Sequence, residues 1–408
     1  MKRIHVFLRK AQSAKRYWVQ NGSYSLICKL LGEIKRRFSD ELHLQFLLWL
    51  KQREFKNDKH FDLSLVTAGF ANRLAGSDHD HDILRRIVRA YSRAKEVQKT
   101  SGPSYQVSNE WLPIYERPLL EVMRALQEED IAALARIYGN FMRDDCSIGL
   151  VGLPINMRKH FFGEKISNRN KKRFLVDFIH RYNLWESFLG TTHDTHDLVS
   201  PCIGNPYGVE IDGTFIKAGS DYLHYYATLI GRLTRHNSHR TVVELGGGFG
   251  GMAYYLVRDS NNITYIDFDL PENLALTAYY LLKAFPNKAL KLFGEVDISD
   301  INITDNEIVL MPSFEISRMH DNCVDLLFNS YSLAEMSAET IKVYISEFMR
   351  IGRNYILHVN HNRDSVVVAD DFGIDLERFD LLYKIPALWN GGRRSDMDEY
   401  EYLFKRIP

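Results

Sequence analysis

The residues best suited to chemistry form a short run in the second half of the chain, Glu244 to Gly251, which reads ELGGGFGG. Glycine tolerates a positive φ and lets a ligand approach bare backbone. The run follows an apolar, strand-like segment and precedes a helical pattern, so we expect its backbone N–H groups to be exposed at a helix N-terminus. The sequence predicts a small-cofactor site here, contacted by Glu244, Gly246, Gly247, Gly248, Phe249 and Gly250.

Charge separates the two classes of ligand that such a loop accepts. The spacing of Gly246, Gly248 and Gly251 satisfies GxGxxG, which alone is a weak signal for a dinucleotide. A dinucleotide brings a pyrophosphate, which the Glu244 carboxylate would repel, whereas S-adenosylmethionine carries an ammonium and a sulfonium that a carboxylate attracts. Its methionine carboxylate can still use the loop N–H groups. The sequence therefore predicts S-adenosyl-L-methionine as cofactor, with a dinucleotide as the alternative.

A second carboxylate is expected at the end of the next strand, where it would bind the ribose. Asp269 follows the strand-like run ITYIDF and precedes Leu270, which we include in the cofactor site. Its two oxygens can accept hydrogen bonds from both ribose hydroxyls. Asp267 is the alternative ligand, and Asp269 could instead serve only to cap the helix that begins at Pro271.

Two motifs, ELGGGFGG and FDLPENL, resemble those of class I S-adenosylmethionine-dependent methyltransferases. GNPYG, HYYA, DLPENLAL and NSYSLAEM further resemble sugar O-methyltransferases of bacterial polysaccharide loci, and this likeness covers about Asn205 to Asn362. It implies methyl transfer to a sugar hydroxyl during O-antigen or capsule synthesis, with a sugar or glycan as acceptor. It also implies an adenine site near Met311–Glu315, and the cofactor site then includes Ser313, Phe314 and Asn329.

Methyl transfer to a hydroxyl requires an aligned nucleophile and a base that removes its proton. Ligands of doubly wound sheets gather beyond the carboxyl ends of the strands, which makes Glu335 and His361 candidate bases. His224 is a third candidate, because it lies in the helix before the glycine loop. Glu335 could instead be a helix-start carboxylate, and His224 a packing residue. We expect His358, within a strand, to be a core histidine.

Two runs combine histidine and aspartate, Asp78–Asp82 and His193–Asp197. A divalent ion would lower the pKa of an acceptor hydroxyl. The first run directly precedes a helix, where aspartate caps the N-terminus, and the second lies in a polar linker. Neither run defines a ligand geometry, so the sequence predicts no metal site.

Short apolar runs alternate with helical patterns over the last 190 residues or so. The expected strands are residues 241–245, 263–269, 307–311, 323–329 and 354–360, with a closing pair at 379–388 and 399–407. Such alternation predicts a parallel sheet with helices on both faces. The fold class is therefore α/β, a Rossmann-like class I methyltransferase sheet preceded by a mainly α-helical N-terminal domain.

Domain boundaries follow from changes in this pattern. From residue 23 to about residue 190, apolar residues recur at intervals of three and four, which is typical of helices. Residues 191–220 are rich in Gly, Pro, Asn and Thr and indicate a linker or short hairpin. We therefore predict a helical domain over 1–190, a linker over 191–220 and a methyltransferase domain over 221–408.

The net charge, the cysteine spacing and the apolar segments limit the possible partners and the cellular location of the protein. The formal net charge is zero and the pI is about 7.3, which argues against a nucleic-acid partner. Residues 1–40 contain ten Lys or Arg, so this segment either contacts an anionic membrane surface or forms a solvated helix pair. No apolar stretch spans a membrane and no CxxC occurs, which indicates a cytoplasmic protein, with the inner face of the membrane as alternative.

Three other functions remain open at this point. The chain could methylate a natural-product hydroxyl, use the GxGxxG loop as an NAD-dependent oxidoreductase, or bind its cofactor without catalysis. The sequence leaves the sugar, its hydroxyl and the oligomeric state open.

Overall fold

The computed structural model describes residues 42–408 except 43–45, 47–48, 51, 59, 75–79, 108–110, 151–157, 159, 163–164, 191–193, 301–305, 363–366 and 390–397. The basic segment 1–40 lies outside the described residues, as do Asp78, His79 and His193 of the two histidine–aspartate runs. No helix among the described residues is both long and apolar enough to cross a membrane.

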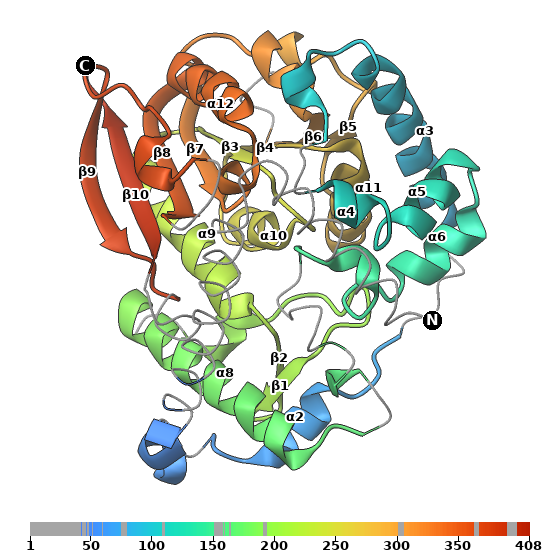
Figure 1. The fold of residues 1–408 in the computed structure, drawn as a ribbon, viewed down its shortest axis with the longest axis vertical. Helices are drawn as coiled ribbons and strands as arrows, with labels where there is room; N and C mark the ends of the chain where they lie inside the picture. Colours follow the sequence, from blue (N-terminus) through green and yellow to red (C-terminus); the bar gives the residue numbers. More distant parts are fainter. Residues whose placement is uncertain are drawn as a thin grey trace, which may run out of the picture.

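An eight-stranded sheet crosses the molecule in the order β5-β6-β4-β3-β7-β8-β10-β9 (Figure 1). Strands β5, β6, β4, β3, β7 and β8 are parallel, and β10 runs antiparallel between β8 and β9. From β3 the strand order continues to β4 on one side and, later in the chain, to β7 on the other. The topological switch point of this doubly wound sheet therefore lies at β3. The strands are β3 (Arg240–Leu245), β4 (Ile263–Asp269), β5 (Leu290–Leu292), β6 (Ile308–Pro312), β7 (Val324–Ser330), β8 (Gly352–His361), β9 (Phe379–Pro386) and β10 (Glu399–Arg406).

Helices cover both faces of the sheet, because successive strand residues point to opposite sides. Val242 packs into a core with α9 (Ser220–Thr234), α10 (Gly251–Arg258) and α11 (Pro271–Ala284), while Val243 packs toward α12 (Ala338–Ile351). In Figure 1 these layers lie below and above the sheet, respectively. The predicted Rossmann-like α/β fold is thus confirmed, and the three-residue strand β5 is an element that the sequence patterns did not indicate.

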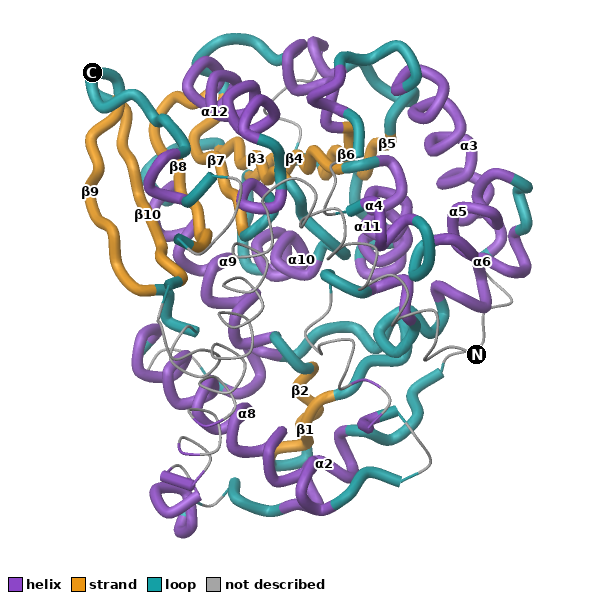
Figure 2. The backbone as a smooth tube through the Cα atoms, viewed as in Figure 1, coloured by secondary structure: helices purple, strands orange, loops and turns teal. Residues whose placement is uncertain are grey.

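The described part of the chain before residue 190 is helical, as predicted. Its buried apolar residues belong to the same core as α9, α10 and α11. Figure 2 shows these helices along the side and lower end of the sheet domain. They are α2 (Leu63–Gly69), α3 (His81–Gln98), α4 (Leu112–Tyr115), α5 (Leu120–Gln127), α6 (Ile131–Tyr138) and α8 (Asn168–Leu189).

Buried polar contacts join α3 to α11. Asp80, which we expected to cap α3, makes no side-chain cap bond; its carboxylate accepts hydrogen bonds from Tyr279 Oη (2.7 Å) and Lys283 Nζ (2.7 Å). The fully buried Glu272 pairs with Lys95 Nζ (2.9 Å) and accepts from Tyr115 Oη (2.6 Å). The first histidine–aspartate run therefore supplies a structural contact between helices.

The predicted hairpin is present between the helical segment and the sheet. Strands β1 (Gly208–Ile211) and β2 (Thr214–Lys217) pair antiparallel, and β2 leads directly into α9. Asp194 and Asp197 form a capping box at the short 3-10 helix Thr195–Leu198, which is how the described part of the second histidine–aspartate run is used.

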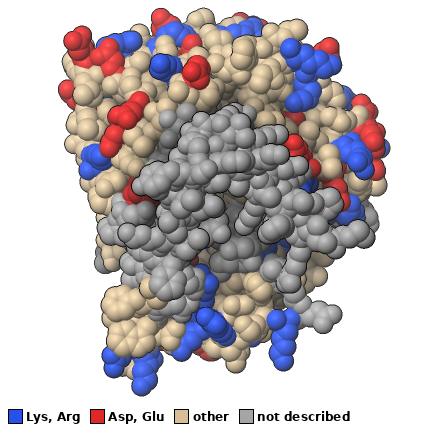
Figure 3. Space-filling view, in the orientation of Figure 1, with Lys and Arg blue, Asp and Glu red and all other residues tan. Residues whose placement is uncertain are grey.

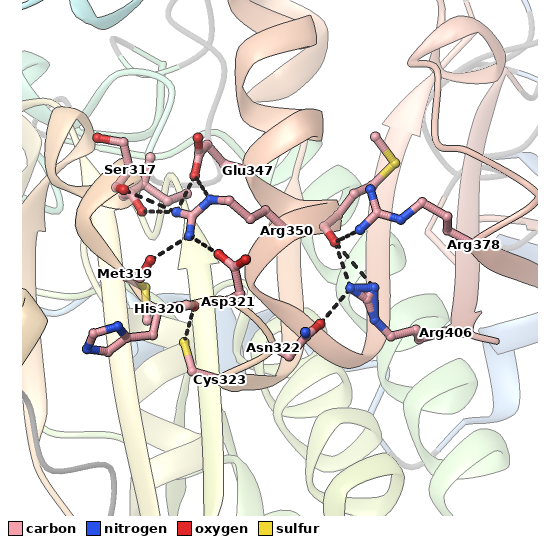
Figure 4. Close-up of polar contacts among 12 residues, drawn as sticks. Ser317, Met319, His320, Asp321, Asn322, Cys323, Glu347, Arg350, Arg378 and Arg406 are labelled. Carbon is pink, nitrogen blue, oxygen red and sulfur yellow. Dashed lines mark hydrogen bonds and ion pairs between the residues drawn. The ribbon is translucent and has the colours of Figure 1, made fainter. Parts of the chain in front are cut away.

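An arginine cluster anchors the C-terminal end of α12 to the segment that precedes β7 (Figure 4). Arg350 donates to Met319 O (2.6 Å), to Asp321 (2.7 Å) and to Glu347 (2.5 Å). Arg406, from β10, bonds Met349 O (3.0 Å) at the same helix end.

On the surface shown in Figure 3, acidic and basic side chains of the described residues are interspersed over the upper part of the molecule.

Candidate functional site

A cavity of about 450 Å³ opens at the carboxyl ends of β3, β4, β6 and β7, within the size range of small-molecule sites. The glycine loop forms one wall, and residues from α9, β2 and the N-terminal helices complete the others. Of the predicted cofactor residues, those that line it are Glu244, Gly246, Gly247, Gly248, Phe249, Asp269, Leu270 and Ser313.

The loop between β3 and α10 depends on glycine at several positions. Gly246 (φ +83°), Gly248 (φ +63°) and Gly250 (φ +84°) adopt the left-handed conformation that glycine allows without strain. Gly250 is the N-cap of α10. At Gly247 the constraint is space, because a Cβ there would lie 2.7 Å from a carboxylate oxygen of Asp267. The loop can therefore adopt this backbone without strain or clash only with glycine at these four positions.

Asp267 supports the loop from behind. Its Oδ1 accepts a hydrogen bond from Gly247 N–H (3.0 Å), the side chain is fully buried, and it does not line the cavity. Burial, reinforced by the neighbouring Asp269 and Glu244, raises the pKa of Asp267 well above its usual value. The alternative ribose ligand of the sequence analysis is therefore a residue that positions the loop.

Two buried carboxylates face the cavity, Glu244 at the end of β3 and Asp269 at the end of β4. Burial raises the pKa of Glu244 to about 7, although Tyr265 Oη donates a hydrogen bond to it (2.5 Å). Burial raises the pKa of Asp269 to about 6, opposed by hydrogen bonds from Asn273 Nδ2 (2.9 Å) and Leu270 N–H (2.7 Å). A cationic ligand would favour the charged form of both groups.

Three predicted cofactor residues, Gly250, Phe314 and Asn329, are not among the residues that line the cavity. Gly250 is the N-cap of α10, and Phe314 packs edge-on against Phe293 at 5.7 Å. Asn329 Nδ2 donates to Leu245 O (2.9 Å) and to Ser332 Oγ (2.6 Å). Asn329 therefore ties the end of β7 to the glycine loop.

The three candidate bases do not meet in one place. Glu335 lines the cavity and accepts a hydrogen bond from Trp111 Nε1 (2.7 Å). His224 is buried on another side of α9, where its ring contacts Trp185 Nε1 (3.0 Å) and Asp259 (3.5 Å). His361 ends β8 opposite Glu399 of β10 and does not line the cavity. Of the three, only Glu335 is positioned to contact a ligand there.

His358 is the buried core residue that we expected. Its ring stacks on Tyr402 at 4.4 Å, and burial lowers its pKa to about 3, so the ring is neutral.

Several cavity residues were not among the predicted site residues, although Tyr331 falls within the NSYSLAEM motif. Arg181 lies mid-way along α8, Tyr331 follows β7 with a left-handed φ of +65°, and Trp389 follows β9. Lys217 could have been noticed, since it is a single basic residue between an apolar run and a helix start. Their roles depend on segments far apart in sequence, which is why periodicity did not find them.

Comparison with known proteins finds similarity only at the level of solved structures. No family model matches the chain, and no curated protein matches it. A SAM-dependent methyltransferase from Aquifex aeolicus is 16% identical, covering 43% of this chain and 88% of that one, with a TM-score of 0.29. The magnesium protoporphyrin IX methyltransferase of Synechocystis with bound SAH is 10% identical, with 62% and 92% covered and a TM-score of 0.33.

A third similar structure is the N-methyltransferase NodS from Bradyrhizobium japonicum in complex with S-adenosyl-L-homocysteine. It is 12% identical, with 45% of this chain and 86% of that chain covered and a TM-score of 0.30. Because identity and TM-score are low in all three cases, we base the function on the geometry of the cavity itself.

Proposed function

We propose that this protein is an S-adenosylmethionine-dependent O-methyltransferase whose acceptor is a sugar hydroxyl. The observation that carries the proposal is the pair of buried carboxylates, Glu244 and Asp269, beside a glycine loop of open backbone. Buried carboxylates that face a cavity favour a cationic ligand and disfavour a pyrophosphate. S-adenosylmethionine suits this site because the carboxylates can attract its cationic groups and can accept hydrogen bonds from its ribose hydroxyls.

Each part of the cofactor has a matching group among the cavity residues. Glu244 would attract the ammonium and sulfonium, and Asp269 would accept hydrogen bonds from the ribose hydroxyls. The N–H groups of the loop around Gly247 and Gly248 would bind the methionine carboxylate. Ser313 and Leu270 would contact the adenosine on the β4–β6 side.

The cofactor would supply a methyl group that its sulfonium already activates for displacement. The protein then has to align a hydroxyl and accept its proton. Glu335 is the candidate base, because its carboxylate lines the cavity and Trp111 fixes its orientation. The sugar acceptor and a role in surface-polysaccharide synthesis rest on the motif resemblance between about Asn205 and Asn362.

Calorimetry with S-adenosylhomocysteine tests the cofactor, and transfer from labelled S-adenosylmethionine to glycan extracts tests the reaction. We expect micromolar binding, no binding of NAD, and a loss of about tenfold or more in Glu244→Gln, since hydrogen bonds to charged groups are worth about 1.5–3 kcal/mol. Glu335→Gln should lower kcat and leave the cofactor Kd unchanged. Binding of NAD in preference to S-adenosylhomocysteine would refute the proposal.

A further inference from the structure

One corner of the cavity is built differently from the carboxylate side. It consists of Arg181, Lys217, Tyr222, Tyr331 and Trp389, and we call it the acceptor corner. The ring of Tyr222 lies 6.4 Å from that of Tyr331 and 5.7 Å from that of Trp389, and the guanidinium of Arg181 lies over Trp389 at 5.7 Å. Three aromatic rings and two cations therefore share this corner.

The acceptor corner adjoins the end of β7, where a nucleophile would be expected. Tyr222 Oη and Ser330 Oγ are hydrogen-bonded at 2.5 Å, and Ser330 is the last residue of β7. Tyr331, the next residue, has a left-handed φ of +65°. Non-glycine residues held in this conformation concentrate at functional sites, because their strain must be offset by surrounding contacts.

Lys217 is the unusual charge in this corner. Its side chain is 2% exposed and lines the cavity, and among the described residues it forms no ion pair, although the carboxylate of Asp221 is near enough to attract it. Its ammonium lies 4.9 Å from the Phe249 ring centre and makes a long 3.5 Å contact with Ala218 O. Burial lowers its pKa to about 8, so it is still mostly charged at neutral pH. An ammonium buried in this way is costly unless an anion joins it.

The neighbouring cation, Arg181, is already compensated. Its guanidinium bonds Asp177 at 3.1 Å and lies 3.8 Å from the buried Asp221. Asp221 also attracts the ammonium of Lys217, but the two groups form no ion pair, so Lys217 is the cation that an anionic ligand can still pair with. The N-terminus of α9 lies beside it, since Gly219 lines the cavity as the N-cap and carries no capping side chain, while Asp221 in the first turn is shared with Arg181.

We propose that Lys217 and the N-terminus of α9 bind an anionic group of the acceptor, while its ring packs against Tyr222, Tyr331 and Trp389. The acceptor class is then a hydroxylated ring that carries a carboxylate or a phosphate, as in a uronic acid or a sugar phosphate. Aromatic rings provide the apolar surface for the ring, and the ammonium selects the anion. This inference rests on the proposed function and specifies its substrate.

Binding to the full chain saturated with S-adenosylhomocysteine tests the inference. A panel of uronic acids and sugar 1-phosphates is measured by calorimetry, each beside the neutral methyl glycoside of the same ring configuration. We expect at least one anionic ligand to bind about tenfold more tightly than its neutral partner. The two anionic arms distinguish carboxylate from phosphate. Lys217→Met should abolish the preference, and Lys217→Arg, which keeps the charge, should retain it.

The same measurements separate this inference from the function on which it rests. If wild-type protein does not bind S-adenosylhomocysteine, the proposed function fails and the acceptor proposal with it. If the cofactor binds but no anionic ligand is preferred, the acceptor proposal alone fails. It also fails if Lys217→Met weakens S-adenosylhomocysteine binding about tenfold, because the ammonium then serves the methionine carboxylate.

Discussion

Three carboxylates crowd the ends of β3 and β4, and their protonation couples the site to pH. Glu244 and Asp269 face the cavity, and Asp267 lies under the loop. Burial raises the pKa of Glu244 to about 7 and that of Asp269 to about 6. Without a ligand, part of this cluster is protonated near neutral pH. A cation can bind well only after the facing carboxylates ionise.

Cofactor affinity should therefore rise with pH. Between about pH 5.5 and about pH 7.5 we expect the Kd of S-adenosylhomocysteine to fall about tenfold, because ionised Glu244 and Asp269 attract its ammonium. Calorimetry across this range measures the change, with proton release detected by comparing buffers of different ionisation enthalpy. Glu244→Gln should flatten much of the profile, and a wild-type Kd independent of pH would contradict the assignment.

The unliganded protein should respond to pH in the opposite direction. Because the folded-state pKa values lie above those of the unfolded chain, the folded protein binds more protons between about pH 4 and about pH 7. This contribution to stability is present below about pH 4 and is lost as pH rises through 6 to 7. S-adenosylhomocysteine should reverse the trend in thermal melts.

At the scale of elements, the site depends on how β3, the glycine loop and α10 fit against β4. Gly246 N–H bonds Phe268 O (2.9 Å), and Thr277 Oγ1 of α11 bonds Gly248 O (2.6 Å). The Asp267 side chain fills the space beneath Gly247. The loop is thus held from both sides, and its shape sets the shape of this wall of the cavity.

Gly247→Ala should disrupt this fit. The new Cβ would lie 2.7 Å from the Asp267 carboxylate, so the loop must shift, at a cost of about 1–3 kcal/mol in unfolding free energy and most of the cofactor affinity. Gly231→Ala in α9 is the matched control, because its nearest neighbour would be 4.0 Å away and helical alanine is favoured. Urea denaturation measures the unfolding free energy of both variants, and calorimetry measures their affinity for S-adenosylhomocysteine. Unchanged affinity in Gly247→Ala would contradict the close packing of the loop on Asp267.

At the scale of the whole molecule, the N-terminal helices and the sheet share one apolar core, with α3 packed on α11. The contacts of Asp80 and Glu272 cross this interface within the core. The cavity also takes walls from both parts, since Trp111 and Arg181 meet the loop residues there. Stability and ligand binding should therefore depend on the helices as much as on the sheet.

Asp80→Ala tests that dependence. It would leave Lys283 and Tyr279 without their partner, and we expect a loss of about 3 kcal/mol, as for other broken buried pairs. Asp82→Ala, on the same helix, removes an exposed partner of Arg85 and should change stability by less than about 1 kcal/mol. Equal effects of the two substitutions in urea denaturation would contradict the shared core.

The sequence by itself determined most of the elements and the glycine loop. Short apolar runs such as ITYIDFD indicate buried strands, and ELGGGFGG indicates a turn because glycine allows its backbone. Both signals are local, so they can be recognised from residue types over a few positions. The strand β5 was not predicted from the sequence, because a segment of three residues is too short to show a recognisable pattern.

Tertiary structure decided which side chains share the cavity. Glu335 lines it, His224 faces Trp185 and Asp259, and His361 lies beside β10. Lys217 and Arg181 reach the same corner from β2 and α8. A helix or strand pattern gives the spacing of residues along one element, whereas the direction in which a given face points depends on the elements packed against it.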